Sequence, residues 1–185
     1  MTISFSAGHQ PVGTTEPDPT TFDGPSLRER ILREVERALN EGSNPHREVL
    51  PAIYPLLTQE FGVDAVLAYL VDGDAMKLAF VEGFDEDSVQ LLQRLDFGQA
   101  ICGTVAASRK PMHVADVQRS LDPRADLVRA VGIAAYASEP VLAGDALLGT
   151  LSFGSRRRRA FTIEEQLFFR AIARLFAHYL QPKVA

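Results

Sequence analysis

Cys102, the single cysteine of the chain, is its strongest candidate for chemistry. It lies near the start of a predicted helix, where the helix terminus lowers the pKa of a thiol and favours the reactive thiolate. A thiolate at this position would act as a redox sensor or as a covalent anchor for a ligand. The alternative is a small apolar residue that packs under the helix, as free cysteines often do. One cysteine excludes an intramolecular disulfide and cannot by itself form a cysteine-based metal site.

Aromatic side chains are a second group of candidates for ligand contact. Their rings offer a stacking surface. The group consists of Tyr69, Phe80, Phe97 and Tyr136. Burial in the core is the alternative for each of them.

A third group is charged and borders the expected site. Asp116, Arg124 and Arg129 lie in a predicted loop and short helix. Arg124, near a helix start, could bind a carboxylate or a phosphate, and a solvated loop charge is the alternative. The four histidines are scattered along the chain, so we predict no metal site.

Composition limits the class of protein that carries these residues. An apolar content of 46% and a charged content of 23% are typical of a globular domain. The net charge of −5 disfavours nonspecific nucleic-acid binding, and Arg156–Arg159 is interpreted as a solvated surface loop. No apolar run reaches the length of a membrane span, and no secretory signal is present, so we expect a cytoplasmic protein.

The chain divides into a tail and one domain. Residues 1–24 are rich in Thr, Pro, Gly and Asp without a hydrophobic period, which predicts a disordered tail. Residues 25–183 form the domain. Capping-box spacings at Ser26–Glu29 and Thr162–Glu165 open helices over 26–40 and 162–180, each with an apolar stripe.

Between these two helices the pattern alternates between strands and short helices. Asn44-Pro45 opens a helix that ends at Gly62 and that Pro51 and Pro55 should bend or delay. Strands are predicted at 63–71, 74–82, 112–115, 133–143 and 146–154, with hairpin turns at Asp72-Gly73 and Gly144-Asp145. Short helices are predicted at 85–94, 98–108 and 123–131. The class is α+β, with a central antiparallel sheet of five to six strands and helices on both sides.

The order of several short motifs resembles the GAF domain, a relative of the PAS fold. The motifs are Phe97-Gly98-Gln99-Ala100-Ile101-Cys102-Gly103-Thr104-Val105-Ala106, Lys110-Pro111 with Val114-Ala115-Asp116, Asp122-Pro123-Arg124, Val131-Gly132-Ile133, Leu147 to Gly154, and Phe161-Thr162. The resemblance covers roughly residues 45–181 and is closest to GAF domains of bacterial sensor histidine kinases. It implies the strand order 2-1-5-4-3, with the glycine-flanked segment 98–108 as a lid over one sheet face.

The resemblance implies a non-catalytic domain that senses a small molecule and signals to a separate partner. The ligand is unidentified, and the expected site residues are Tyr69, Phe97, Cys102, Val105, Asp116, Arg124, Tyr136 and Ser138. A homodimer through the terminal helices is expected, although each helix could instead bury its stripe on its own sheet. The alternatives are a degenerate scaffold that binds only proteins and a thiol-based redox sensor using Cys102.

Other activities of this family fit the sequence less well. The free methionine sulfoxide reductase has the same fold, but its thiol chemistry needs at least a second cysteine, so we predict that the chain is not an enzyme. Bilin photoreceptors need an attachment cysteine, which 123–131 lacks. The acidic-lysine signature of cyclic-nucleotide-binding members is also missing.

Overall fold

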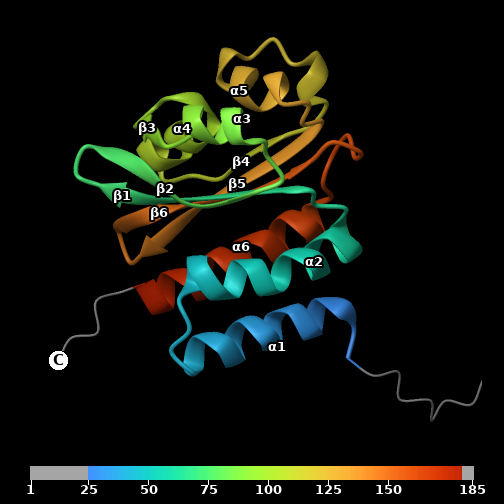
Figure 1. Ribbon diagram of the computed structural model, residues 1–185, viewed down its shortest axis with the longest axis vertical. Helices are drawn as coiled ribbons and strands as arrows, with labels where there is room; N and C mark the ends of the chain where they lie inside the picture. The colour runs from blue at the N-terminus through green and yellow to red at the C-terminus, as the bar shows by residue number, and fades with distance from the viewer. Residues whose placement is uncertain (1–24, 181–185) are drawn as a thin grey trace, which may run out of the picture.

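A six-stranded antiparallel sheet separates two layers of helices in the computed structural model, which describes residues 25–180 (Figure 1). The predicted tail at 1–24 and the last three residues of the predicted domain, 181–183, lie outside the described residues. The strand order is β3-β2-β1-β6-β5-β4. The strands are β1 Ala65–Asp72, β2 Ala75–Glu82, β3 Arg94–Asp96, β4 Met112–Val114, β5 Ala135–Ala143 and β6 Ala146–Ser155. The α+β class with helices on both sides of the sheet is confirmed.

The long helices are α1 Leu27–Asn40, α2 Leu50–Phe61 and α6 Ile163–Leu180. The long helices α2 and α6 lie on one face of the sheet, with α1 packed on their outer side, and three shorter helices cover the other face (Figure 1). The shorter ones are α3 Glu86–Leu91, α4 Ala100–Ser108 and α5 Asp126–Ala130. A π-helical turn, Pro45–Val49, precedes α2, and 3-10 turns occupy Val117–Arg119 and Pro123–Ala125. No helix among residues 25–180 is long and apolar enough to cross a membrane.

Local signals for the long helices are confirmed. The Ser26 hydroxyl accepts from the Glu29 amide while the Glu29 carboxylate accepts from the Ser26 amide. The Thr162 and Glu165 pair makes the same two reciprocal bonds at 3.3 and 2.7 Å. The π-helical turn ends two residues before Pro51, which has no amide hydrogen with which to continue a regular α-helical ladder.

Two hairpins form the central strands of the sheet. Both turns read Gly-Asp, with positive φ at Gly73 (64°) and Gly144 (59°), which a two-residue hairpin turn needs at its first position. The turn predicted at Asp72-Gly73 is wrong by one residue, because Asp72 pairs with Ala75 and belongs to the strand. The turn at Gly144-Asp145 is confirmed.

The largest difference from the prediction lies between β2 and α4. The helix predicted for 85–94 ends at Leu91, and the chain then forms β3 against the edge of β2. Leu95 in this short strand is 2% exposed. The segment is therefore held by burial of Leu95, which the helical pattern of the sequence did not indicate. The helix predicted for 123–131 begins as a 3-10 turn and becomes α-helical only at Asp126.

The alternation of side chains along the strands produces two separate cores. One core joins the sheet to α1, α2 and α6, and includes Phe61, Phe153 and Phe169. The other lies under α3, α4 and α5, and includes Tyr69 and Tyr136. The second core has fewer buried residues than the first and contains the candidate site.

Candidate functional site

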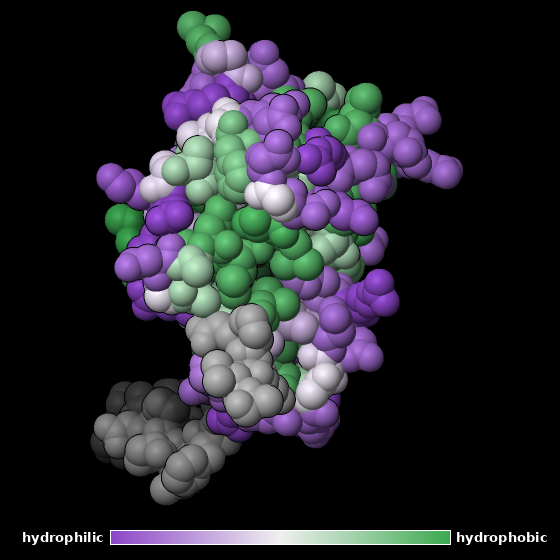
Figure 2. All heavy atoms as spheres, turned by 90° about the vertical axis from the view of Figure 1, so that its left-hand side faces the viewer, coloured by the Kyte–Doolittle hydropathy of each residue, from purple (hydrophilic) through white to green (hydrophobic). Residues whose placement is uncertain are grey.

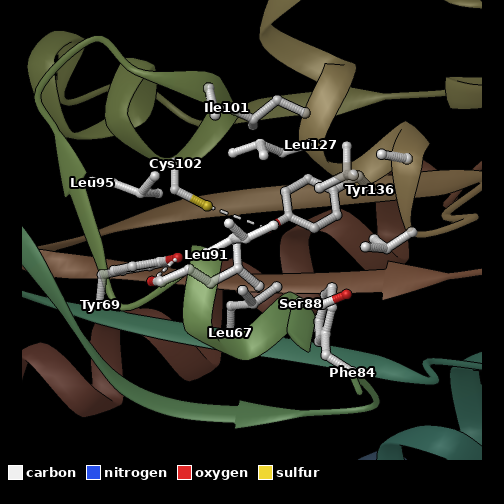
Figure 3. A pocket seen from close by; sticks show the side chains of 15 residues that line it. Leu67, Tyr69, Phe84, Ser88, Leu91, Leu95, Ile101, Cys102, Leu127 and Tyr136 are labelled. Atoms are coloured by element: carbon white, nitrogen blue, oxygen red, sulfur yellow. Dashed lines mark hydrogen bonds between the residues drawn. The ribbon is translucent and has the colours of Figure 1, made fainter. Parts of the chain in front are cut away.

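An apolar cavity of about 70 Å³ lies between the sheet and the three short helices (Figure 3). Its floor is formed by Leu67 and Tyr69 of β1 and by Tyr136 of β5. These residues point to the same side because their strands belong to one sheet and side chains alternate with a period of two. Ile101 and Cys102 of α4 form the roof.

The roof helix α4 lies close to the sheet edge because of one glycine. A Cβ at Gly103 would lie 2.4 Å from the Asp96 carbonyl oxygen at the end of β3. The Gly98 amide donates to the Gly103 carbonyl at 2.8 Å, which joins the segment before α4 to the helix itself. Gly103 therefore lets the lid approach β3 closely, whereas Gly98 has a φ of 85° that favours glycine. A lid over this sheet face was predicted from the glycine-flanked segment, but its contact with β3 was not.

A chain of buried hydrogen bonds runs from the cavity wall into the sheet. Ser152 Oγ donates to Ser138 Oγ at 2.8 Å, and Cys102 Sγ lies 3.4 Å from Ser152 Oγ and 3.2 Å from Tyr136 Oη. Because Ser152 has one proton and gives it to Ser138, the Cys102 thiol donates to Ser152 and the Tyr136 hydroxyl donates to the sulfur. Burial raises the pKa of the Cys102 thiol, so the thiol in this series of hydrogen bonds is neutral at pH 7.

Tyr69 connects the floor of the cavity to its wall. Its hydroxyl donates to the Leu92 carbonyl at 2.9 Å, at the C-terminal end of α3. Burial raises the pKa of Tyr69 and of Tyr136, so both phenols remain protonated. Both rings thus present neutral oxygen atoms to an otherwise apolar space.

Two segments that line the cavity are bonded by Arg156, which the sequence analysis did not assign to the site. Its Nη2 donates to the Gly83 carbonyl at 2.6 Å and its Nε donates to the Val131 carbonyl at 3.2 Å. Its guanidinium carbon also lies 5.7 Å from the centre of the Phe84 ring. Since Phe84 and Val131 line the cavity, Arg156 joins two of its walls.

The other arginines of this run are also paired. Arg158 bonds Glu165 at 2.5 Å and the Phe61 carbonyl at 3.0 Å, and Arg159 pairs with Asp116. The interpretation of Arg156–Arg159 as a surface loop agrees with the structure: the side chains of Arg157 and Arg159 are 69% and 62% exposed. The loop is nevertheless bonded to other segments, because Arg158 reaches the distant Phe61 carbonyl and Arg159 reaches Asp116.

The structure brings some of the predicted site residues together. Tyr69, Cys102 and Tyr136 all line the cavity (Figure 3). Ser138 is fully buried and connects to the cavity through Ser152 and Cys102. Val105 is fully buried in the same core but does not line the cavity.

The other three predicted residues lie apart from the cavity. Phe97 is 38% exposed and lines a different groove with Val71 and Leu147. The face that carries the β1–β2 and β5–β6 turns shows a band of apolar residues across its middle (Figure 2). Asp116 pairs with Arg159, and Arg124 makes a 2.6 Å ion pair with its neighbour Asp122.

The sequence analysis missed much of the wall. Ser88 and Leu91 of α3 and Leu127 of α5 line the cavity, and they were assigned no role because short helices of mixed polarity carry no chemical signature. Phe80 packs on the opposite sheet face, against the long helices. Within residues 25–180, no group of three or more His, Cys, Asp or Glu side chains could hold a metal ion.

Comparison with solved structures places this fold among known proteins. The GAF domain of a phosphoenolpyruvate-protein phosphotransferase from Coxiella burnetii is 23% identical, with a TM-score of 0.68 over 83% of this chain and 92% of that chain. A free methionine-R-sulfoxide reductase from Neisseria meningitidis, solved with its substrate, is 22% identical, with a TM-score of 0.67 over 83% and 87%. A type II free methionine-R-sulfoxide reductase from Thermoplasma acidophilum is 18% identical, with a TM-score of 0.57 over 79% and 94%. No curated protein sequence matches the chain.

These structures correct one prediction. The prediction that the chain is not an enzyme is wrong. Two of these proteins are reductases with the same fold, so the fold is compatible with catalysis. The cysteine count spoke against one reaction scheme that uses two thiols. It did not exclude catalysis on this scaffold.

The strand order and the family comparison lead to the same assignment. If the short edge strand β3 is set aside, the order β2-β1-β6-β5-β4 is the 2-1-5-4-3 order that the sequence resemblance implies. The family model for the GAF domain matches residues 46–180, which span β1 to β6, the cavity and α6. This match supports a sensing or regulatory role, and the chain belongs to the GAF domain family.

Proposed function

We propose that the cavity under α4 binds a small molecule and that its occupancy regulates a separate signalling partner. The observation that carries this proposal is a partly open cavity between the sheet and three short helices, roofed by α4 and lined by Tyr69, Cys102 and Tyr136. Small-molecule sites in proteins are typically concave, apolar and equipped with a few convergent polar groups.

Strand β5 offers a route from the cavity to the long helices. Tyr136 and Ser138 face the cavity side of the sheet, whereas Glu139 faces the helical side. The fully buried Glu139 carboxylate accepts from Arg170 of α6 at 3.0 Å. A shift of β5 caused by a ligand would therefore move the attachment point of α6.

The long helices supply an exposed surface through which a bound partner could respond to this movement. Ile163 and Leu167 of α6 are 74% and 53% exposed, and Leu167 lines a groove with Leu32 of α1 and Leu175. We propose that a second copy of the chain covers this groove, as the terminal helices predict. Sedimentation equilibrium tests this: wild type should dimerise and Leu167→Glu should be monomeric, whereas a monomeric wild type at high micromolar concentration removes the proposal.

A filled cavity provides the test of ligand binding. In Val128→Phe, four carbon atoms are added on α5 at a buried position of the cavity wall. Native mass spectrometry of protein purified from its own host should show an added small-molecule mass on the wild type and on Ala52→Leu, a control on the exposed face of α2, but not on Val128→Phe. Equal ligand content in all three proteins, or none together with no response to a metabolite panel, contradicts the proposal and favours a scaffold that binds only proteins.

Thiol chemistry at Cys102 is a second candidate, since this side chain is in the cavity wall. Burial raises the pKa of the thiol, so a thiolate would form only when a ligand or a movement of α4 changes its surroundings. Turnover of methionine sulfoxide, or oxidation by hydrogen peroxide, that is lost in Cys102→Ser would support this candidate. Wild-type and Cys102→Ser proteins that behave identically in both assays would remove it.

Three finer points remain predictions. The resemblance to GAF domains of sensor histidine kinases comes from sequence motifs, and the GAF structure compared above is part of a phosphotransferase. A bacterial origin and a cytoplasmic location also rest on the sequence alone.

A further inference from the structure

We propose that the ligand of this cavity is uncharged and largely apolar, and that any polar group it places against the two tyrosines is a hydrogen-bond donor. This inference rests on the proposed function, because it concerns the same cavity. It follows from the charge of the cavity wall, from the hydrogen bonds that its polar groups make, and from the volume of the cavity (Figure 3).

The wall contains no charged side chain. Apart from Ser88, Cys102 and the two tyrosines, every side chain that lines it is hydrocarbon. The guanidinium of Arg156, which bonds the wall residue Val131, donates to the Gly83 and Val131 carbonyls and to Asp64 rather than into the cavity. A carboxylate or phosphate inside would lose its hydration without a compensating partner, which costs far more than burial of an apolar group yields.

Each of the four polar hydrogens of Tyr69, Tyr136, Cys102 and Ser152 is already donated in a hydrogen bond within the protein. Tyr69 donates to Leu92, Tyr136 donates to Cys102, and the thiol donates to Ser152, which donates to Ser138. The two phenolic oxygens therefore offer lone pairs to the cavity and no free hydrogen. A ligand hydroxyl or N–H can donate to them without breaking any of these bonds, whereas a ligand carbonyl cannot.

The size of the cavity fits a compact guest. About 70 Å³ is several times the roughly 10–15 Å³ that one water molecule needs. Leu91 lines the mouth and is 74% exposed, so its side chain can turn outward to admit a ring. None of the residues of α3 is buried, which leaves this side of the mouth the easiest to displace.

Three probes with one ring and different substituents test the proposal. Phenol carries a donor, toluene carries none, and benzoate is charged. Binding is measured by chemical-shift titration of the full chain at neutral pH. We expect phenol to bind about two- to tenfold more tightly than toluene, the range that one net hydrogen bond provides. Benzoate should show no saturable binding.

Variants separate a failure of this inference from a failure of the proposed function. Val128→Phe, which enlarges a buried wall residue, should abolish binding of phenol and toluene, and Ala52→Leu should not. Tyr136→Phe should remove much of the advantage of phenol while toluene still binds. Benzoate binding that Val128→Phe blocks, or equal affinities for phenol and toluene, overturns the inference but keeps the cavity as a site. Absence of binding by all three probes counts against both.

Discussion

The carboxylate of Glu139 and the guanidinium of Arg170 are joined across the sheet–helix interface, with Nε of Arg170 donating to Oε2 of Glu139 at 3.0 Å. Glu139 is fully buried on β5, and its other oxygen lies 2.6 Å from Nε2 of His113 on the edge strand β4. One carboxylate therefore joins β4, β5 and α6. It does so on the sheet face opposite the cavity.

Removal of Arg170 should destabilise the protein, because a buried carboxylate loses one of its two partners. We expect Arg170→Met to lower the free energy of unfolding by about 2 kcal/mol, below the usual cost of breaking a buried pair since His113 still bonds Glu139. Urea unfolding measures this. Arg174→Met, at an exposed position one turn further along α6, is the control and should change stability by less than about 0.5 kcal/mol. Equal effects of the two variants would contradict the role given to Glu139.

Arg156→Lys should loosen the two segments that Arg156 joins beside the cavity, without unfolding the domain. Lysine cannot reproduce the planar fork that bonds the Gly83 and Val131 carbonyls together. Amide hydrogen exchange should become faster in residues 83–92 and 128–133, while α1 and α6 remain protected. The control is Arg157→Lys, because the Arg157 side chain is 69% exposed. Unchanged exchange in both segments would show that Arg156 does not hold the walls.

Gly103→Ala should displace α4 from the sheet edge. The new Cβ would lie 2.4 Å from the Asp96 carbonyl oxygen, so the helix or β3 must move. We expect a loss of about 1–3 kcal/mol in the free energy of unfolding, as for other overpacked positions, together with altered chemical shifts around Cys102. Ala107→Ser, on the exposed side of α4, is the control. A stable Gly103→Ala protein with unchanged shifts would mean that close contact between α4 and β3 is not required.

His46 should make stability depend on pH below neutrality. Its ring is buried against Phe176, and burial lowers its pKa from 6.5 to about 4. The unfolded chain therefore binds more protons than the folded one between these values. The free energy of unfolding should fall as the pH drops from 6.5 to 4, by roughly 3 kcal/mol from this residue.

Urea unfolding at pH 7, 6, 5 and 4.5 tests this dependence in the wild type, His46→Leu and His178→Gln. The slope between pH 6.5 and 4.5 should be shallower in His46→Leu. It should be unchanged in His178→Gln, because His178 is exposed on α6. Parallel curves for wild type and His46→Leu would show that His46 does not contribute.

The sequence alone determined the elements whose signals are local. Capping boxes at Ser26 and Thr162 and the turn at Gly144-Asp145 depend on residues within four positions of one another, and all three are found. The two predicted hairpin turns also indicated an antiparallel sheet. The strand β3 escaped prediction because its three residues form a strand only by pairing with β2.

Only the tertiary structure decided which side chains meet around the cavity. Cys102 and Ser152 are 50 positions apart, and Arg156 reaches Gly83 across 73 positions. Such contacts depend on the order of strands in the sheet and on the side of the sheet to which each residue points. For this reason Tyr69, Cys102 and Tyr136 converge, whereas Asp116 and Arg124, whose loop runs outside the cavity wall, find ionic partners elsewhere.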